Sequence, residues 1–325
     1  MRLHNNAPLH DPDPGQGEAG NPGRSRRAAA CVRRPAPPTL RIRGRSGMKI
    51  AVVQMNSGTD VAANVAKACD FVARAAAAGA GLIVLPEFFN TLYFAQYWDT
   101  AWTRLAEPES GPSITAVREA ARRHRVHVIA TIYEDAGAGV YFDTAIHLDP
   151  DGRRRFKFRK IHPAGVKSLE KLFFRYGSRL DTYALDAWRV GIGICYDMGF
   201  PETARTLTVN GAELLIAPYA TARREMFQEM LRVRAFENGA YLAAANKVGI
   251  EGNWDLGGQS LIVDPTGRIL ASANDKDEAL LVAEIDRARV VEQRARWPVL
   301  RDRRPDLYGP LTAETEDVLD AQGRA

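Results

Sequence analysis

The 325-residue sequence has few cysteines and no long apolar run, and each lack narrows what the chain can be. No apolar stretch approaches the roughly 18 residues that a membrane-spanning helix needs, which argues against a membrane protein. The three cysteines (Cys31, Cys69 and Cys195) form neither a C-x-x-C pair nor a disulfide framework, so we predict a protein of the reducing cytoplasm. The chain also lacks the internal repeats of a solenoid.

The net charge of +5 is concentrated in one segment. Residues 1–47 hold nine arginines, no lysine and three acidic residues, so this segment carries +6 and the rest of the chain −1. Because the body is not basic, the charge does not indicate a nucleic-acid-binding protein. Residues 1–47 are also rich in Pro and Gly and lack apolar periodicity, which predicts a disordered leader. Met48 opens the first apolar strand, and one hypothesis is that translation begins there.

After the leader, strand-like and helix-like patterns alternate. Two Asp-Pro-x-Gly turns predict hairpins, and no Pro/Ser linker divides residues 48–300, so we expect one mixed α/β domain with helices covering the sheet faces. Period-2 alternation and short apolar runs predict strands at 49–55, 81–87, 126–134, 144–160 (two strands), 188–194, 212–219, 240–249, 260–271 (two strands) and 279–286. Helical spacing predicts helices at 61–78, 113–125, from 201 onward and at 223–238.

Three polar residues follow predicted strands: Glu87, Lys160 and Cys195. Strand ends that open into a crevice are where sites collect in α/β sheets. Cys195 would stand just before the helix that begins at Pro201, a position that lowers a thiol pKa and offers backbone N–H groups to an oxyanion. A thiol nucleophile, a carboxylate base and an ammonium facing the attacked carbonyl or nitrile would together make a covalent hydrolase.

Each of these residues also has an ordinary structural interpretation when taken alone. Cys195 could be a buried thiol, Glu87 could cap a helix, and Lys160 could be one more solvated charge in the basic run "RRRFKFRK". The histidines offer no obvious base, although His162 lies two residues after Lys160. The pair "HRVH" has no further ligands nearby, so we predict no metal site.

Three motifs in this order, "LPEFF", "FRKIHP" and "GICYDMGFPE", resemble the nitrilase, or carbon–nitrogen hydrolase, superfamily. The resemblance covers about residues 48–312 and implies an α-β-β-α four-layer sandwich and a Glu-Lys-Cys triad. It implies Glu87 as general base, Lys160 as oxyanion stabiliser and Cys195 as nucleophile, with the Tyr196 backbone N–H as a second oxyanion donor. Glu170 resembles a further glutamate that supports the lysine, although it could instead pair with a neighbouring cation on a helix face. No metal or organic cofactor is implied.

The flanking segments bear on the substrate. The sequence "CYDMGFPE" is similar to family branches that hydrolyse carbamoylputrescine or simple amides, and it lacks the arginines with which enzymes of N-carbamoyl-D-amino acids hold a carboxylate. We therefore expect a small amide or N-carbamoyl (ureido) substrate. A nitrilase, or an inactive binding or regulatory protein on the same scaffold, are the alternatives. An aromatic group could border the pocket or fill the core: Phe88, Phe89, Tyr93, Phe94 and Trp98. Arg223 and Arg224 could meet an acidic substrate group or simply begin a helix.

The family resemblance also implies a partner. Its members form dimers or larger homo-oligomers by packing two sandwiches face to face. The tail "WPVLRDRRPDLYGPL" is similar to an arm that crosses to a neighbouring subunit, which leads us to expect an extended C-terminal arm over residues 301–325.

Overall fold

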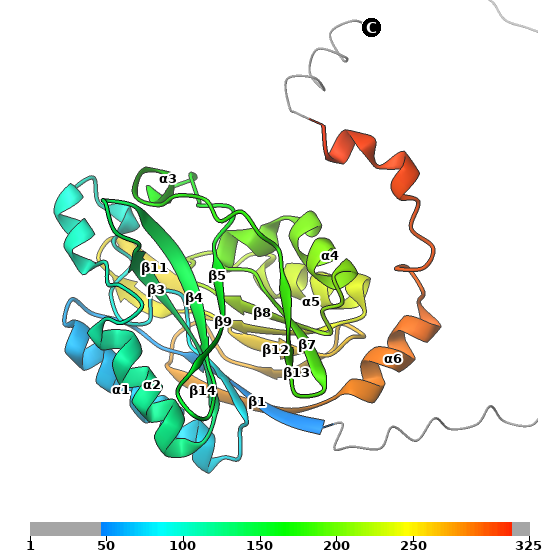
Figure 1. Cartoon of the computed structure of the whole chain (residues 1–325), viewed down its shortest axis with the longest axis horizontal. Coiled ribbons are helices and arrows are strands. Elements are labelled where there is room, and N and C mark those ends of the chain that lie inside the picture. The colour runs from blue at the N-terminus through cyan, green and yellow to red at the C-terminus, as the bar shows by residue number, and fades with distance from the viewer. Residues whose placement is uncertain (1–46, 314–325) are drawn as a thin grey trace, which may run out of the picture. The chain divides into compact units, whose positions relative to one another are not determined.

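The computed structural model describes residues 47–313, and the strands of this part form two six-stranded sheets and one two-stranded ribbon (Figure 1). Each large sheet has three parallel central strands flanked by antiparallel ones. The first sheet has the order β14 (Ala279–Asp286), β1 (Gly47–Gln54), β2 (Leu82–Val84), β3 (His127–Asp135), β4 (Tyr141–Leu148), β5 (Arg154–Arg159). The second has the order β13 (Ile269–Ser272), β12 (Leu261–Val263), β9 (Tyr241–Ala245), β8 (Leu214–Pro218), β7 (Trp188–Ile192), β6 (Thr182–Leu185). The ribbon pairs β10 (Val248–Glu251) with β11 (Trp254–Gly257).

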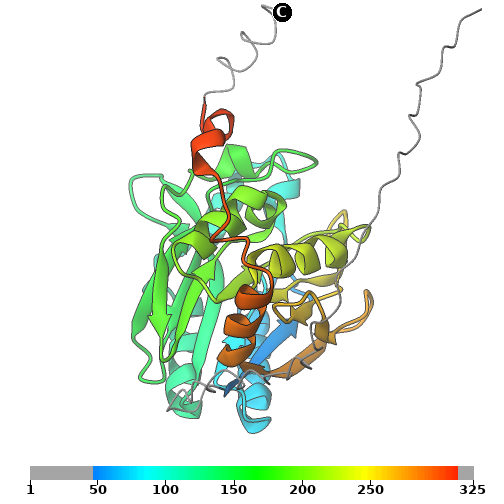
Figure 2. The ribbon, with the colours of Figure 1, turned by 90° about the vertical axis from the view of Figure 1, so that its right-hand side faces the viewer.

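Helices cover the outer face of each sheet (Figures 1 and 2). The first sheet packs against α1 (Val61–Ala77) and α2 (Pro112–His124), and the second against α4 (Pro201–Val209) and α5 (Phe227–Asn238). The described chain also contains α3 (Glu170–Phe173), α6 (Arg287–Arg296) and the 3₁₀ turns η1 (Phe94–Gln96), η2 (Thr100–Leu105), η3 (Cys195–Gly199), η4 (Pro305–Leu307) and η5 (Gly309–Leu311).

The alternation of side chains in β1 shows how the layers are held together. Ile50 and Val52 are buried between the two sheets, whereas Ala51 and Val53 are buried beneath α1 and α2. A strand buried on both faces must be apolar at every position, which explains the continuous run "IAVV". The arrangement is therefore the predicted α-β-β-α sandwich.

Local sequence signals explain most of the element boundaries. The Asp60 carboxylate accepts a hydrogen bond from the Ala63 N–H at 3.1 Å and so caps α1, and Pro201 occupies the first turn of α4 as predicted. The segment 240–249, predicted as one strand, is instead divided between β9 and β10, because the Asn246 side chain bonds the backbone of Thr221 and Gly258 and takes the chain out of the sheet. The sequence patterns did not predict β6, β11 or α6.

The ends of the chain leave two predictions untested. The leader, apart from Gly47, lies outside the described residues, and so do residues 314–325 of the proposed arm. Residues 304–313 are exposed, with short 3₁₀ turns at η4 and η5. In the described part of the chain, no helix combines the length and apolar character needed to cross a bilayer.

Candidate active site

Lys160 lies one residue beyond β5, and backbone contacts fix its position. Its N–H donates to the Asp143 carbonyl of β4 at 2.9 Å, and its own carbonyl accepts from the Gly177 N–H at 2.7 Å. A Cβ at Gly177 would lie 2.0 Å from the Arg159 carbonyl oxygen, so only glycine permits this close approach. The Lys160 side chain is 1% exposed, which rules out its interpretation as a solvated charge of the basic run.

Glu87 lies three residues beyond β2 and is also fully buried. Its backbone N–H donates to the Tyr219 carbonyl at 3.3 Å, just past the end of β8. This contact joins the carboxyl end of a strand in the first sheet to that of a strand in the second. The adjacent Phe88 has a φ of +50°, so the chain turns sharply directly after the carboxylate.

Cys195 begins η3, between β7 and α4, and its φ of +48° lies in the left-handed region that non-glycine residues seldom occupy. Strained conformations of this kind are concentrated at functional sites. The preceding Gly193 makes room for the turn, since a Cβ there would lie 2.9 Å from Met198 Cε. The buried Asp197 carboxylate accepts from the Ile194 N–H at 3.0 Å and from the His162 N–H at 2.8 Å, which ties the turn to the segment after Lys160.

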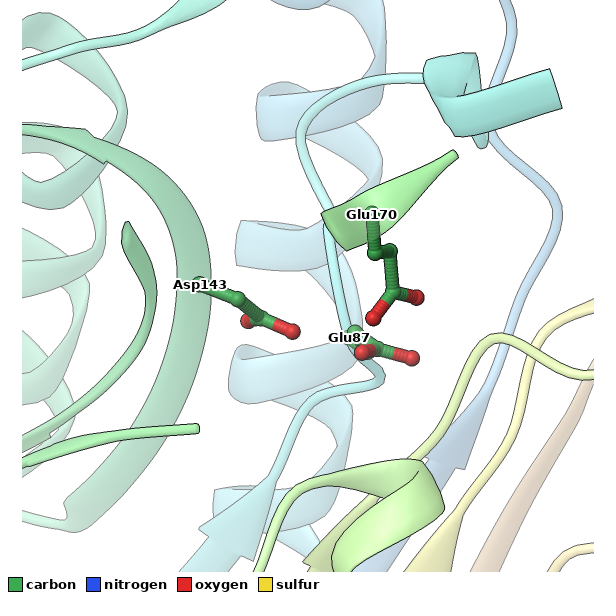
Figure 3. A group of neighbouring side chains, drawn as sticks. All are labelled: Glu87, Asp143 and Glu170. Carbon is green, nitrogen blue, oxygen red and sulfur yellow. The ribbon is translucent and has the colours of Figure 1, made fainter. Parts of the chain in front are cut away.

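The Lys160 ammonium lies among three buried carboxyl groups. Its Nζ is 2.7 Å from Glu87 Oε1, 2.7 Å from Glu170 Oε2 and 3.3 Å from Asp143 Oδ2. Figure 3 shows the three carboxyl groups pointing toward one another from separate segments of the chain. One oxygen of each lies within 4.8 Å of the others, a spacing that could hold a metal ion. The lysine ammonium already supplies the cation of this cluster.

Glu170 is held as an ionic partner of Lys160. Its Oε1 accepts from the Tyr93 hydroxyl at 2.8 Å, and its Oε2 accepts from the Ala164 N–H at 2.8 Å as well as from Lys160. The alternative that Glu170 pairs with a neighbouring cation on a helix face is therefore wrong. Glu251 in turn holds Tyr93, because its Oε2 accepts a hydrogen bond from the Tyr93 N–H at 2.7 Å. The buried Lys247, between β9 and β10, balances the charge of Glu251 at 2.8 Å.

Electrostatics connect Cys195 to this cluster. Burial disfavours the Lys160 ammonium, but Glu170, Glu87, Cys195 and Asp143 outweigh it and hold the pKa of Lys160 well above its usual value. Burial and the Glu87 carboxylate raise the pKa of the Cys195 thiol far more than Lys160 lowers it. The expectation of a lowered thiol pKa is therefore wrong, because desolvation exceeds the effect of the helix end. A resting thiol of this kind needs a base to take its proton.

The other predicted residues lie as follows. Tyr196 follows Cys195 within η3, and its half-exposed ring stacks edge-on against Phe200. The Arg224 guanidinium is already paired, with Asp255 at 3.0 Å and with Asp275 at 3.5 Å. Of the five aromatic residues considered for the pocket wall, only Trp98 is exposed, and the others fill the core: Phe88, Phe89, Tyr93 and Phe94.

Sequence reasoning missed three contributors to the site: Asp143, Asp197 and Tyr93 as the partner of Glu170. Asp143 had one readable signal, an acidic residue at an inward position of the apolar strand "YFDTAIHL". Asp197 had another, an acid two residues after the cysteine in "CYDMG". Neither signal identifies the group that the side chain contacts.

Comparison with known proteins agrees with this geometry. The family model described as "Carbon-nitrogen hydrolase" matches residues 49–295. The chain is 34% identical to an N-carbamoylputrescine amidase from Solanum tuberosum, over 81% of this chain and 94% of that protein, and 32% identical to an omega-amidase from Homo sapiens, over 81% and 97%. A mutant amidase from Nesterenkonia has a similar structure, with a TM-score of 0.69 and 27% identity over 80% of this chain and 95% of that one. It carries the acetamide moiety of fluoroacetamide covalently on its active-site cysteine.

The sandwich, and a cysteine next to a buried lysine–carboxylate cluster, define a thiol hydrolase. More specifically, the chain belongs to the carbon–nitrogen hydrolase family, and it is a hydrolase of the amidase type with an active-site cysteine.

Proposed function

We propose that this enzyme hydrolyses a small amide or N-carbamoyl compound through an acyl-enzyme on Cys195. The observation that carries the proposal is the convergence of Glu87, Lys160 and Cys195, which follow strands of both sheets, on one buried charged cluster. Such a cluster supplies a nucleophile, a proton acceptor and an oxyanion partner without further groups.

In the first half-reaction, Cys195 Sγ attacks the carbonyl carbon while its proton passes to Glu87. The raised pKa of the thiol favours this route, because free thiolate is scarce before substrate binds. The oxyanion that forms is stabilised by Lys160 Nζ and by the Tyr196 backbone N–H. Glu87 then returns the proton to the leaving nitrogen, the C–N bond breaks, and a thioester remains on Cys195.

In the second half-reaction, Glu87 takes a proton from water as the water oxygen attacks the thioester carbon. Collapse of this intermediate expels the Cys195 sulfur, which recovers the proton from Glu87. A simple amide gives a carboxylic acid and ammonia or an amine. An N-carbamoyl amine gives the free amine, carbon dioxide and ammonia. Throughout, Glu170 keeps the Lys160 ammonium in place through Oε2, which also accepts from the Ala164 N–H, while its Oε1 accepts from the Tyr93 hydroxyl.

The charges around η3 bear on which substrates fit. The buried Arg234 donates to the carbonyls of Met198 and Gly199 and pairs with Glu237, so its cation is already engaged in supporting the turn. The Asp197 carboxylate is likewise occupied, because it contacts the backbone N–H groups of Ile194 and His162 and the His162 ring. With no free arginine directly after Cys195, we favour neutral or cationic N-carbamoyl amines and small amides over N-carbamoyl amino acids.

A panel of substrates tests this proposal. We expect ammonia release from N-carbamoyl diamines and short amides, slower release from N-carbamoyl amino acids, and little from nitriles, with kcat/KM measured for each. Release from nitriles alone would replace the proposal with a nitrilase. No turnover of any member by the folded protein would indicate a binding protein.

We also propose that the enzyme works as a homodimer or larger homo-oligomer in the cytoplasm, with residues 48–300 as the catalytic domain and 301–325 as an arm. The compartment follows from the nucleophile, since a catalytic thiol must stay reduced. Apolar side chains are exposed on α4, on α5 and in the tail, as expected of surfaces that a partner covers: Val209, Val233, Phe236, Leu307 and Leu311.

Sedimentation measures the assembly directly. We expect the protein to sediment as a dimer or larger species at micromolar concentration. Truncation after Arg301 should weaken the assembly, because it removes the exposed apolar residues of the tail. Monomers throughout this concentration range would contradict the proposed assembly, and an unchanged assembly after truncation would remove the arm from it.

A further inference from the structure

Asp143 is a buried acid for which the reaction described above has no use. It lies in β4, with 0% of its surface exposed, and its Oδ2 is 3.3 Å from Lys160 Nζ. One of its oxygens also lies within 4.8 Å of a Glu87 carboxyl oxygen. Within the described residues, neither Asp143 oxygen has a hydrogen-bond donor, and Glu87 Oε2 is likewise without one.

Two adjacent carboxylates can share a hydrogen bond only if one of them carries a proton, because an ionised carboxylate is an acceptor alone. If Glu87, Asp143 and Glu170 were all ionised, three buried negative charges would face one buried ammonium. Burial in a low dielectric makes such an excess very costly, so a proton is retained. The question is which carboxyl group holds it.

The hydrogen-bond donors around each carboxyl group indicate that Glu170 is ionised, which leaves Glu87 and Asp143 to share the retained proton. Glu170 accepts from Lys160, Tyr93 and the Ala164 N–H, as an anion should. Glu87 Oε1 accepts from Lys160 at 2.7 Å, whereas Asp143 has only the longer 3.3 Å approach. Asp143 is therefore the member with the weakest support for a negative charge.

We propose that Asp143 is a positioning residue, a carboxylic acid kept neutral in the working enzyme that donates its proton in a hydrogen bond to Glu87. This bond fixes the Glu87 carboxylate toward Cys195 and removes one negative charge from the place where the thiolate must form. The inference rests on the proposed role of Glu87 as base. Burial and the neighbouring Glu87 raise the pKa of Asp143 well above its usual range, which agrees with a neutral side chain.

The titratable groups around Asp143 set the sign of the pH effect. Glu87, Lys160 and Glu170 are its charged neighbours, the Cys195 thiol belongs to the same cluster, and Tyr133 is its register partner on β3. When the pH rises through the pKa of Asp143, a second negative charge appears beside Glu87 and opposes formation of the thiolate. Activity should therefore fall on the alkaline side of that pKa.

Infrared spectroscopy tests the protonation state without relying on turnover. We expect the wild-type enzyme at neutral pH to show the C=O stretch of a buried protonated carboxyl group. The band should vanish in Asp143→Asn and persist in Glu170→Gln. Absence of the band in the wild type, or its loss only in Glu170→Gln, would overturn the proposal. A wild-type enzyme that turns over no substrate would instead refute the proposed function and leave this result readable.

Paired substitutions test the role in the reaction. Asp143→Leu removes the donor at similar volume and should lower kcat about 10²-fold with little change in KM. Asp143→Asn keeps a neutral N–H donor, so its kcat should be close to that of the wild type. Because asparagine does not ionise, the fall in kcat at alkaline pH should shift or disappear in this variant. Asp135→Asn, at the end of β3, is the matched control and should leave the profile unchanged.

The outcomes separate cleanly. If Asp143→Asn is as impaired as Asp143→Leu while both melt as folded proteins, Asp143 works as an anion and the proposal is wrong. If Asp143→Leu retains full kcat, Asp143 has no positioning role. If Asp143→Leu does not fold, the infrared band and the pH profile of Asp143→Asn still decide the question.

Discussion

Replacing Cys195 with alanine should abolish turnover and leave the fold intact. The substitution removes the only atom proposed to bond to the substrate, so we expect kcat to fall by more than about 10⁴-fold, the scale on which loss of a covalent nucleophile acts. The fold should survive because alanine is small and apolar, like the buried thiol it replaces, and because its backbone meets the same strain at a φ of +48°. Ammonia release and thermal melting measure the two parts of this prediction.

Cys69→Ala is the matched control, since Cys69 is a half-buried cysteine of α1. It should keep turnover, whereas Cys195→Ala should lose it. Turnover that persists in Cys195→Ala, or that disappears in Cys69→Ala with the fold unchanged, would assign the chemistry to the wrong thiol.

The sequence was most informative where a polar residue interrupted an apolar pattern at the end of a strand. Glu87, Lys160 and Cys195 were each identified in this way, because a charge or thiol directly after a buried strand needs a reason. Strand-period alternation likewise predicted most of the two sheets. These signals are local, but each of the three residues had an ordinary structural interpretation when taken alone, and only the three motifs together pointed to a site.

What the sequence could not predict depends on distant neighbours. Asp143 lies within a strand rather than at its end, and Glu87, whose carboxyl group lies near it, is 56 positions away, so no local spacing links them. The raised pKa of Cys195 has the same origin. The turn before α4 was predicted correctly, but the degree of desolvation depends on the packing of both sheets. Helix α6 escaped notice because it buries only Val290 and Gln293, and five of its 10 residues are charged.

Lys160→Met should also abolish turnover, and in addition it should make stability depend on pH in a new way. Loss of an oxyanion donor lowers kcat by about 10²- to 10³-fold, and loss of the cation that orders Glu87 should add to this. Removing one partner of a buried ion pair costs about 3–5 kcal/mol of stability. The carboxyl groups left behind, Glu87, Asp143 and Glu170, must then be protonated to remain buried.

The sign of the pH effect follows from these protons. In the unfolded chain the carboxyl groups titrate near their ordinary values of about 4, whereas the folded variant retains their protons to higher pH. Because the folded state then binds more protons, the free energy of unfolding of Lys160→Met should fall as the pH rises above about 4, by about 1.4 kcal/mol per unit for each such carboxyl group. Denaturant unfolding at several pH values measures this slope.

Lys157→Met is the control, because it makes the same substitution three residues earlier, within β5. Lys157 is partly exposed and pairs with Glu134 at 2.8 Å, and Arg159 continues to pair with that carboxylate when Lys157 is removed. It should therefore retain turnover and lose no more than about 1 kcal/mol of stability. Wild type and Lys157→Met keep the buried ammonium, so in both the loss of stability above pH 4 should be shallower than in Lys160→Met, with the neutral Asp143 contributing to it. If Lys160→Met still turns over substrate, the Lys160 ammonium does not assist the chemistry. If its stability varies with pH as that of Lys157→Met does, the ammonium does not keep the neighbouring glutamates ionised.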